Sequence, residues 1–551
     1  MMDQSSGKMK KTVRDSGAVV RSIAVLLLLS GVLYFTNLGG VCLSGKDEYR
    51  YAEVAQEIHR TGDWFVLRLN NEPYPDKPPL YFWMVGLFSL PEKQVGPWSA
   101  RLPLALSGIA TVLLAFAMGR ILYDTKTGFW SGIILMVAGR YYWGIRWVRL
   151  DLPLVAFTTA SLSCFGYLYF RRRGPRALLA WLFWFFIGCA LLSKGPPALV
   201  VPAAVIFFLW KIREWDFWRE LKWFPGIFLP ILMLLAWLIP AMLGGGGEYS
   251  QEMMWDQVFV RIFRSWRHHK PIVYYLYKIF GDFQPWALFL PAALVIMWKS
   301  RKIRENEKRV TFLITWILVI LIPFSLVRGK RGAYILPMYP ALAIIMARYF
   351  LSIMRGGKPG LEFRIPATII GIGILLTSAV AMIHPAILDH FDINLERISL
   401  LPLVPLLLLS LGLLLSLWRR ETLVSIVLIF IIAYYLMLSP FLLFFPYQIT
   451  DRPVREITGR IMNEYGPGDL VYAKDTDEYK FLLYGNYYLR RIPEGRWFDT
   501  PPGRKIFVIL ENKYVESLMK PWVRNRDWWI HYRTGEGKKD FTLISNQPPN
   551  K

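Results

Sequence analysis

The sequence predicts a polytopic α-helical membrane protein that ends in a small α/β domain. Two observations lead to this fold class. Of the 551 residues, 54% are hydrophobic and only 19% are charged, a composition too apolar for an ordinary soluble protein. The chain also contains many apolar runs long enough to cross a bilayer. The sequence of the region from 447 to 551 instead predicts short strands and a helix.

Thirteen apolar runs are expected to be transmembrane helices. The first, 20–39, follows a basic N-terminus as a signal peptide would, but the many later runs favour a retained helix. The run at 78–90 is too short to span and is expected to lie on the membrane surface as an interfacial helix. The other twelve spans are expected at 98–122, 127–146, 152–170, 177–193, 196–211, 223–243, 285–299, 310–327, 333–351, 365–384, 398–417 and 421–445.

The distribution of lysine and arginine predicts the orientation. The clusters at 171–176, 211–222 and 299–309 fall on the side of the N-terminus, which the positive-inside rule makes cytoplasmic. We therefore expect a transmembrane domain at 1–446, whose first outer loop is 40–97, and an extracytoplasmic domain at 447–551. The net charge of +25 fits this topology and lipid headgroups, and nucleic acid is not an expected partner.

The region 447–551 predicts an α/β domain. DLVYAKD, KIFVIL, WWIHY and FTLIS have the composition of strands, and DRPVREITGRIMNEYG that of a helix ended by Gly466-Pro467. The chain has no glycine-rich phosphate loop, so no nucleotide is expected. Its three cysteines are scattered and predict neither a disulfide nor a thiolate metal cluster.

The stretch SGKDEYRYAEV, at 44–54, predicts an amphipathic helix on the outer membrane surface. Ser44 suits the N-cap, and Asp47 and Glu48 fall in the first turn, where the helix dipole favours carboxylates. Simple capping is therefore one interpretation of this acidic pair. The apolar stripe and the stop signal are Tyr51, Val54, Ala55 and Ile58, followed by Thr61-Gly62.

Charged residues recur at the outer ends of the spans, where positive charge is disfavoured. A specific partner must compensate this charge, and a phosphate at headgroup depth would do so. These polar residues are Asp76, Lys77, Arg149, Asp151, Lys194, His268, His269, Lys270, Arg328, Lys330, Arg331 and Tyr334.

Five stretches carry a resemblance to a known family. DEYRYAEVA, DKPPLYFW, RLDLP, a His-Lys-Pro-aromatic loop and KRGAYILPMYPALA follow one another in the order seen in bacterial aminoarabinose transferases and their relatives in the protein-mannosyltransferase superfamily. The resemblance covers about 1–445 and implies the GT-C fold. It also implies transfer, with inversion, of a sugar from an undecaprenyl phosphate or other polyprenyl-phosphate carrier. The implied acceptor is lipid A or a related envelope glycolipid, at the periplasmic face of a bacterial inner membrane.

The candidate site residues follow from this chemistry. The departing phosphate needs cationic and hydroxyl donors, and the acceptor hydroxyl needs a carboxylate. The resemblance places Asp47 and Asp151 as the two acidic residues, with Glu48 as the neighbouring carboxylate. Candidates for the donor phosphate are Arg50, Lys77, Lys330, Arg331 and Tyr334.

Each candidate also has a purely structural interpretation. Lys77 can be a snorkelling lysine, Lys330 and Arg331 can anchor lipid headgroups, and Tyr334 can belong to an aromatic belt. Asp151 can be a helix cap paired with Arg149.

The resemblance also implies a divalent metal ion, zinc or magnesium or manganese, between Asp76 and His268, with His269 as the competing ligand. Asp76 is shorter than the glutamate of the aminoarabinose transferases, and two protein ligands leave most of a zinc shell open. A solvated pair of histidines is the alternative.

Three other functions compete with lipid modification. Transfer to protein hydroxyls is the alternative within the superfamily. A lipid or sugar transporter or flippase would show internal repeats or broken paired spans, and neither is clear in this sequence. A membrane scaffold would leave the clustered outer charges unexplained.

Overall fold

The structure is a computed structural model of the full chain. It describes all residues except 1, 173–174, 252–269, 328, 356–359, 384–402, 444–451, 474–478, 492–503, 513, 516–527, 535–539 and 549–551. The chain divides into two compact units. The first comprises Met1–Leu38, Pro75–Tyr81 and Arg101–Tyr447, and the second comprises Gly39–Tyr74, Phe82–Ala100 and Gln448–Lys551. This grouping differs from a division at 446, and the boundary predicted there stays a prediction.

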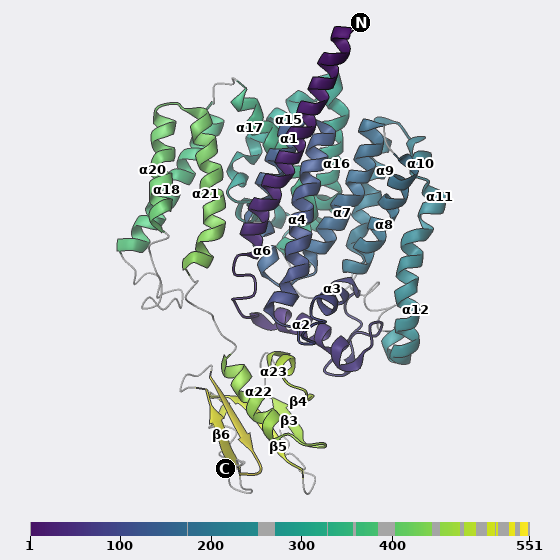
Figure 1. The fold of residues 1–551 in the computed structure, drawn as a ribbon, viewed down its shortest axis with the longest axis vertical. Coiled ribbons are helices and arrows are strands. Elements are labelled where there is room, and N and C mark those ends of the chain that lie inside the picture. The colour runs from purple at the N-terminus through teal and green to yellow at the C-terminus, as the bar shows by residue number, and fades with distance from the viewer. Residues whose placement is uncertain are drawn as a thin grey trace. The chain divides into compact units, whose positions relative to one another are not determined.

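The first unit is helical (Figure 1). Its elements are α1 (Met2–Phe35), α4 (Pro97–Leu122, which begins in the second unit), α5 (Thr125–Met136), α6 (Gly139–Arg146), α7 (Asp151–Gly166), η1 (Tyr167–Arg171), α8 (Arg176–Lys194), η2 (Pro196–Leu199), α9 (Val200–Ile212), α10 (Phe217–Glu220), α11 (Trp223–Gly226), α12 (Phe228–Gln251), α14 (Tyr274–Asp282), η4 (Trp286–Phe289), α15 (Leu290–Ser300), α16 (Arg304–Leu326), η5 (Gly332–Met338), α17 (Tyr339–Met354), α18 (Leu361–Ile383), α20 (Leu403–Trp418) and α21 (Thr422–Leu443).

Eight helices in the described residues are long and apolar enough to cross a membrane, and four shorter apolar helices accompany them. They confirm the predicted fold class, while the count of thirteen spans stays a prediction. The run expected at 127–146 is broken into α5 and α6. Val137 leaves the helical conformation, and the Gly139 amide donates to the Gln284 carbonyl at 2.8 Å. The second piece carries Arg140 and Arg146, and the buried Arg146 donates from Nη2 to the Leu33 carbonyl at 2.8 Å.

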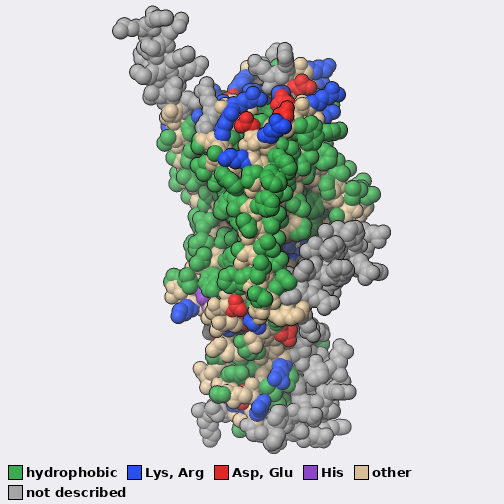
Figure 2. All heavy atoms as spheres, turned by 90° about the vertical axis from the view of Figure 1, so that its right-hand side faces the viewer, with side chains coloured by type: hydrophobic (Ala, Val, Ile, Leu, Met, Phe, Trp, Pro, Cys, Tyr) green, Lys and Arg blue, Asp and Glu red, His purple; other side chains and the backbone are tan. Residues whose placement is uncertain are grey.

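On the face seen in Figure 2, hydrophobic side chains form a tall band, and basic and acidic side chains gather most densely above it. On α12, for example, Leu232 is 61% exposed and Leu243 is 81% exposed. So much exposed hydrocarbon on long helices fits a lipid solvent, because helices satisfy their own backbone hydrogen bonds there. The chain is thus a multi-pass membrane protein.

The second unit contains the first loop and the C-terminal region. Its elements are α2 (Gly45–Thr61), β1 (Arg68–Leu69), β2 (Glu72–Pro73), most of α3 (Leu80–Phe88), α22 (Arg452–Glu464), β3 (Leu470–Ala473), α23 (Tyr479–Tyr484), β4 (Leu489–Arg491), β5 (Ile506–Glu511), β6 (Trp529–Arg533) and β7 (Phe541–Ser545). The helix expected at 78–90 is present as α3, and its position on a membrane stays a prediction.

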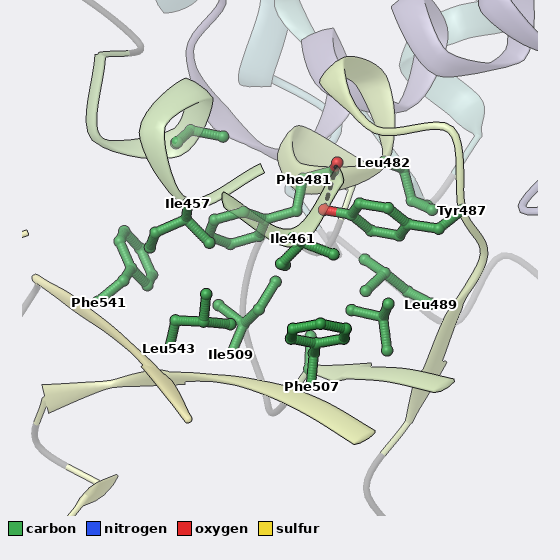
Figure 3. Packing of buried hydrophobic residues seen from close by; sticks show 13 residues of the cluster. Ile457, Ile461, Phe481, Leu482, Tyr487, Leu489, Phe507, Ile509, Phe541 and Leu543 are labelled. Carbon is green, nitrogen blue, oxygen red and sulfur yellow. Dashed lines mark hydrogen bonds between the residues drawn. The ribbon is translucent and has the colours of Figure 1, made fainter. Parts of the chain in front are cut away.

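The C-terminal sheet confirms the predicted α/β character. Its strand order is β4-β3-β5-β7-β6, parallel across β4, β3 and β5 and antiparallel from β5 onwards. Helix α22 packs Ile457 and Ile461 onto the sheet residues Phe507 and Ile509 in one hydrophobic core (Figure 3). The sequence did not predict α23 and β4.

Helix α2 has the predicted boundaries. The apolar stripe is buried as expected, and Gly62 ends the helix in the left-handed conformation, with φ of 72°. However, the polar face is covered as well, because every residue from Glu48 to Ile58 except Arg50 is buried. The predicted helix is therefore present, and its place on the outer membrane surface stays a prediction.

Candidate functional site

The structure brings together two of the predicted charges of the first unit, Asp151 and Lys194. Asp151 is the first residue of α7 and is 8% exposed, and Lys194 is the last residue of α8. Their side chains form an ion pair. The alternative that Asp151 pairs with Arg149 is wrong, because the Arg149 guanidinium instead lies 5.5 Å from the ring centre of Trp147.

Lys194 also joins this pair to the KRGAY segment. Its Nζ lies 5.0 Å from the ring centre of Tyr334, a cation–π distance. Tyr334 belongs to η5, which packs against α7 and α16. One lysine thus connects the RLDLP motif with the tyrosine predicted to meet the donor phosphate.

The DKPP motif approaches the same end of α8. Gly195 follows Lys194 with φ of 76°, a conformation that favours glycine, and a Cβ built on it would lie 3.9 Å from Pro78 Cγ. Asp76 and Lys77, in the loop before α3, are half-buried. The structure therefore brings three of the five resembling stretches towards the ion pair.

Lys330 and Arg331 play different structural parts. Lys330 is 4% exposed, and its Nζ donates to the Lys270 carbonyl at 3.0 Å. Arg331 is exposed, and its own carbonyl accepts a hydrogen bond from the Tyr275 hydroxyl at 3.1 Å. The structure thus gives Lys330 a role in holding the turn, whereas Arg331 presents its side chain outward.

Helix α14 supports this turn with a carboxylate that the sequence did not single out. Asp282 is buried and pairs with Lys278 at 2.9 Å. A Cβ on Gly332 would lie 2.5 Å from Asp282 Oδ2, so only glycine fits there. No pattern in the sequence links Asp282 to a residue fifty positions later.

Asp47, Glu48 and Arg50 belong to the second unit. Arg50 Nη2 donates to Asp47 Oδ1 at 2.7 Å, and its guanidinium lies 5.1 Å from the ring centre of Tyr51. Glu48 is buried and accepts from the Ser44 amide at 2.7 Å. Ser44 is the N-cap, as predicted, but its side chain makes no capping hydrogen bond. Glu48 thus serves the helix start, which leaves Asp47 as the more accessible carboxylate.

The metal site is only partly within the described residues. Asp76 is described, but His268 and His269 lie outside the described residues. No group of three or more His, Cys, Asp or Glu side chains suited to a metal occurs in the described part of the chain. The fit of a divalent ion to Asp76 and a histidine stays a prediction.

Comparison with known proteins agrees with the resemblance in the motifs. The family model described as dolichyl-phosphate-mannose-protein mannosyltransferase matches residues 76–240. A protein of Aquifex aeolicus is 28% identical over 392 residues, which cover 71% of this chain and 74% of that protein. The undecaprenyl phosphate-alpha-4-amino-4-deoxy-L-arabinose arabinosyl transferase of Pectobacterium atrosepticum is 28% identical over 398 residues, which cover 68% of this chain and 67% of that protein.

Solved structures show the fold. The crystal structure of ArnT from Cupriavidus metallidurans bound to undecaprenyl phosphate matches with a TM-score of 0.74 at 19% identity, over 97% of this chain and 98% of that chain. The structure of the same protein in the apo state matches with a TM-score of 0.73 at 20% identity. The resemblance to aminoarabinose transferases is confirmed, and this chain has the GT-C fold that they share.

Proposed function

We propose that this protein is an integral-membrane glycosyltransferase. It moves a sugar from an undecaprenyl-phosphate carrier to an envelope glycolipid such as lipid A, with inversion at the anomeric carbon. The observation that carries the proposal is the buried Asp151–Lys194 pair beside Tyr334, in a chain with the fold of a protein solved with undecaprenyl phosphate. Tyr334 supplies a hydroxyl donor of the kind that stabilises a departing phosphate, and the ion pair beside it holds its ring in place.

The proposed chemistry breaks the bond between the anomeric carbon and the phosphate oxygen. The electron pair goes to the phosphate, whose developing charge is stabilised by Lys77, Arg331 and Tyr334. Lys194 and Asp151 hold Tyr334 and the adjoining segment in place. The acceptor oxygen forms the new bond to carbon, and Asp47 takes its proton. If a divalent ion binds at Asp76, it would add positive charge near the phosphate, and no step above depends on it.

The proposed location is a bacterial inner membrane, with the C-terminal domain and the acidic first loop in the periplasm. The positive-inside pattern of the loops at 171–176, 211–222 and 299–309 supports this orientation. A phosphatase reporter fused after residue 447 should be active in cells. If a reporter that works only in the cytoplasm is active at the same fusion point, the proposed orientation is wrong.

The function is tested with the purified full chain in lipid vesicles. Undecaprenyl-phosphate aminoarabinose is supplied with lipid A or with a hydroxyl-bearing peptide, and mass spectrometry follows the acceptor. A mass gain on lipid A supports the proposal. A gain on the peptide alone would instead support protein O-glycosylation, which the family model over 76–240 favours. Movement of the intact donor between leaflets without any acceptor gain would indicate a transporter.

A further inference from the structure

Arg60, in the last turn of α2, connects the first loop to the C-terminal domain within the second unit. Its Nη2 donates to the Leu482 carbonyl at 2.6 Å and to the Gly485 carbonyl at 2.7 Å. Its Nη1 contacts two carboxylates of its own helix, Glu53 and Glu57. The planar guanidinium therefore bonds four acceptors at once, which a lysine ammonium cannot reproduce in the same geometry.

The partners of Arg60 make it costly to remove. Glu53 is fully buried and Glu57 is 1% exposed. A single guanidinium lies against both carboxylates, and its loss would leave two buried acids without their cation. Arg60 also lies where α23 ends, and a helix C-terminus favours positive charge.

The segment that Arg60 binds is anchored in the core of the C-terminal domain. Leu482 and Tyr487 are buried in the hydrophobic cluster, and the Tyr487 hydroxyl donates to the Phe481 carbonyl at 3.3 Å (Figure 3). Arg60 therefore binds a backbone segment that is packed into the hydrophobic core of the C-terminal domain.

Other side chains of the first loop bind the same stretch of the C-terminal domain, taken as residues 482–489. Asn70 exchanges two hydrogen bonds with the Leu489 backbone, at 2.8 and 2.9 Å. Gln94 donates to the Leu483 carbonyl at 2.8 Å. The first loop thus binds the C-terminal domain at Arg60, Asn70 and Gln94.

Helix α2 is continuous from its first turn, which carries Asp47, to its last turn, which carries Arg60. The two residues are about 20 Å apart along a helix that rises about 1.5 Å per residue. Because an α-helix moves as a rigid rod over this length, whatever fixes its last turn also fixes the direction of its first turn.

We propose that Arg60 is a positioning residue: by binding the C-terminal domain to α2, it holds the Asp47 carboxylate in the orientation that transfer needs. This inference rests on the proposed function. It gives the C-terminal domain a role in the reaction that acts through α2. A shift of about 1 Å in a reacting group costs about 10²-fold in rate, so a loosened α2 should lower kcat.

The test compares Arg60→Gln with Arg68→Gln in the full chain. Arg68 is another arginine of the same loop, and its Nη1 donates to the Asn71 carbonyl of its own hairpin at 3.2 Å. Arg60→Gln should lower kcat by about 10- to 100-fold with little change in the KM for the donor. Arg68→Gln should transfer sugar normally. Arg60→Lys, which keeps the charge but not the fork, should recover part of the loss.

Asn70→Ala provides a second test of the proposal if Arg60→Gln does not fold. It cuts another bond to the same segment without exposing a buried charge, and it should lower kcat by about 3- to 10-fold at an unchanged folded fraction. Normal kcat in folded Arg60→Gln, or in Asn70→Ala where Arg60→Gln does not fold, would overturn the positioning role.

Comparison with Asp47→Asn shows whether a negative result contradicts the positioning role of Arg60 or the proposed function itself. If the wild type transfers sugar and Asp47→Asn does not, while Arg60→Gln is fully active, only the positioning role is wrong. If the wild type shows no transfer with any donor, the proposed function fails first and the positioning role falls with it.

Discussion

Lys194 ion-pairs with Asp151, although forty-three positions separate them in the sequence. The pair joins the last residue of α8 to the first residue of α7. The same ammonium lies over the ring of Tyr334. Substitution of Asp151 or Lys194 should therefore alter the position of Tyr334, which we assign to the donor phosphate.

We expect Asp151→Asn and Lys194→Met each to slow transfer by about 10²-fold, because each removes a charge that orders the phosphate-binding residues. The double variant should be little slower than either single variant, since the two residues act as a unit. Turnover of the three variants measures this coupling. Lys308→Met is the control, because its pair with Glu214 is largely exposed and should matter little. Additive losses in the double variant would contradict the paired role.

Replacing Asp47 and Glu48 by their amides should show which of the two carboxylates takes part in transfer. Asp47→Asn keeps the size and helix-start preference of the residue but loses the proton acceptor, so it should fold normally and transfer sugar at least about 10²-fold more slowly. Glu48→Gln keeps an oxygen for the Ser44 amide and should lose much less activity. Single-turnover rates with quantified folded protein measure both. Normal transfer by Asp47→Asn beside an inactive Glu48→Gln would show that Glu48 is the reactive carboxylate.

Substitution of Arg331 should lower mainly the rate of transfer, whereas substitution of Lys330 should lower mainly the stability of the protein. Arg331→Gln removes an exposed cation and should slow transfer by about 10²-fold, with a smaller loss of thermal stability than Lys330→Met. Lys330→Met leaves the Lys270 carbonyl without its donor and should cost about 1–3 kcal/mol of stability. Melting curves and turnover, measured together, distinguish the two. Equal stability loss in both variants would mean that Arg331 is structural as well. Lys77→Ala, at another predicted phosphate contact, should slow transfer as Arg331→Gln does.

Glu53 should make the second unit sensitive to pH. Burial, opposed by Arg60 and reinforced by Glu57, raises the pKa of Glu53 from 4.5 to about 7. A carboxyl whose pKa is raised on folding adds stability below its ordinary pKa and loses it as pH rises through the folded value. Between pH 4.5 and 7, stability from this group should therefore fall as pH increases.

Glu53→Gln should remove that slope, because the amide keeps the size but does not titrate. The rate at which protease releases the C-terminal domain, followed from pH 5 to pH 8, measures the change. The charged and titratable groups that face Glu53 are Glu57, Arg60, Tyr487 and Tyr488, and the wild type and the Glu53→Gln variant both keep them unchanged. A wild type and a Glu53→Gln variant with identical pH profiles would show that Glu53 does not titrate in this range.

Local patterns in the sequence were enough to predict most elements. The stop at Thr61-Gly62, the helix before Gly466 and the strands around Phe507 and Leu543 all follow from residues close together in the chain. Helix α23 and strand β4 were missed because six- and three-residue segments are too short to show a period.

The partners within the site were harder to predict, because they depend on tertiary contacts. The sequence offered Arg149 to Asp151 as a neighbour, whereas the fold supplies Lys194 from another helix. In the same way, the polar face of α2 looked solvated until the structure placed Arg60 against Leu482, more than four hundred positions away. Long-range pairing of this kind leaves no periodic signal in a single sequence.

The release of undecaprenyl phosphate from a lipid-linked sugar tests the central claim most directly. Folded full-length protein, given undecaprenyl-phosphate aminoarabinose and lipid A, should release one undecaprenyl phosphate for each sugar that appears on the acceptor. Asp47→Asn, at the same folded concentration, should release it at least about 10²-fold more slowly. Failure of folded wild-type protein to release undecaprenyl phosphate from aminoarabinose, mannose or other sugar donors would contradict the account.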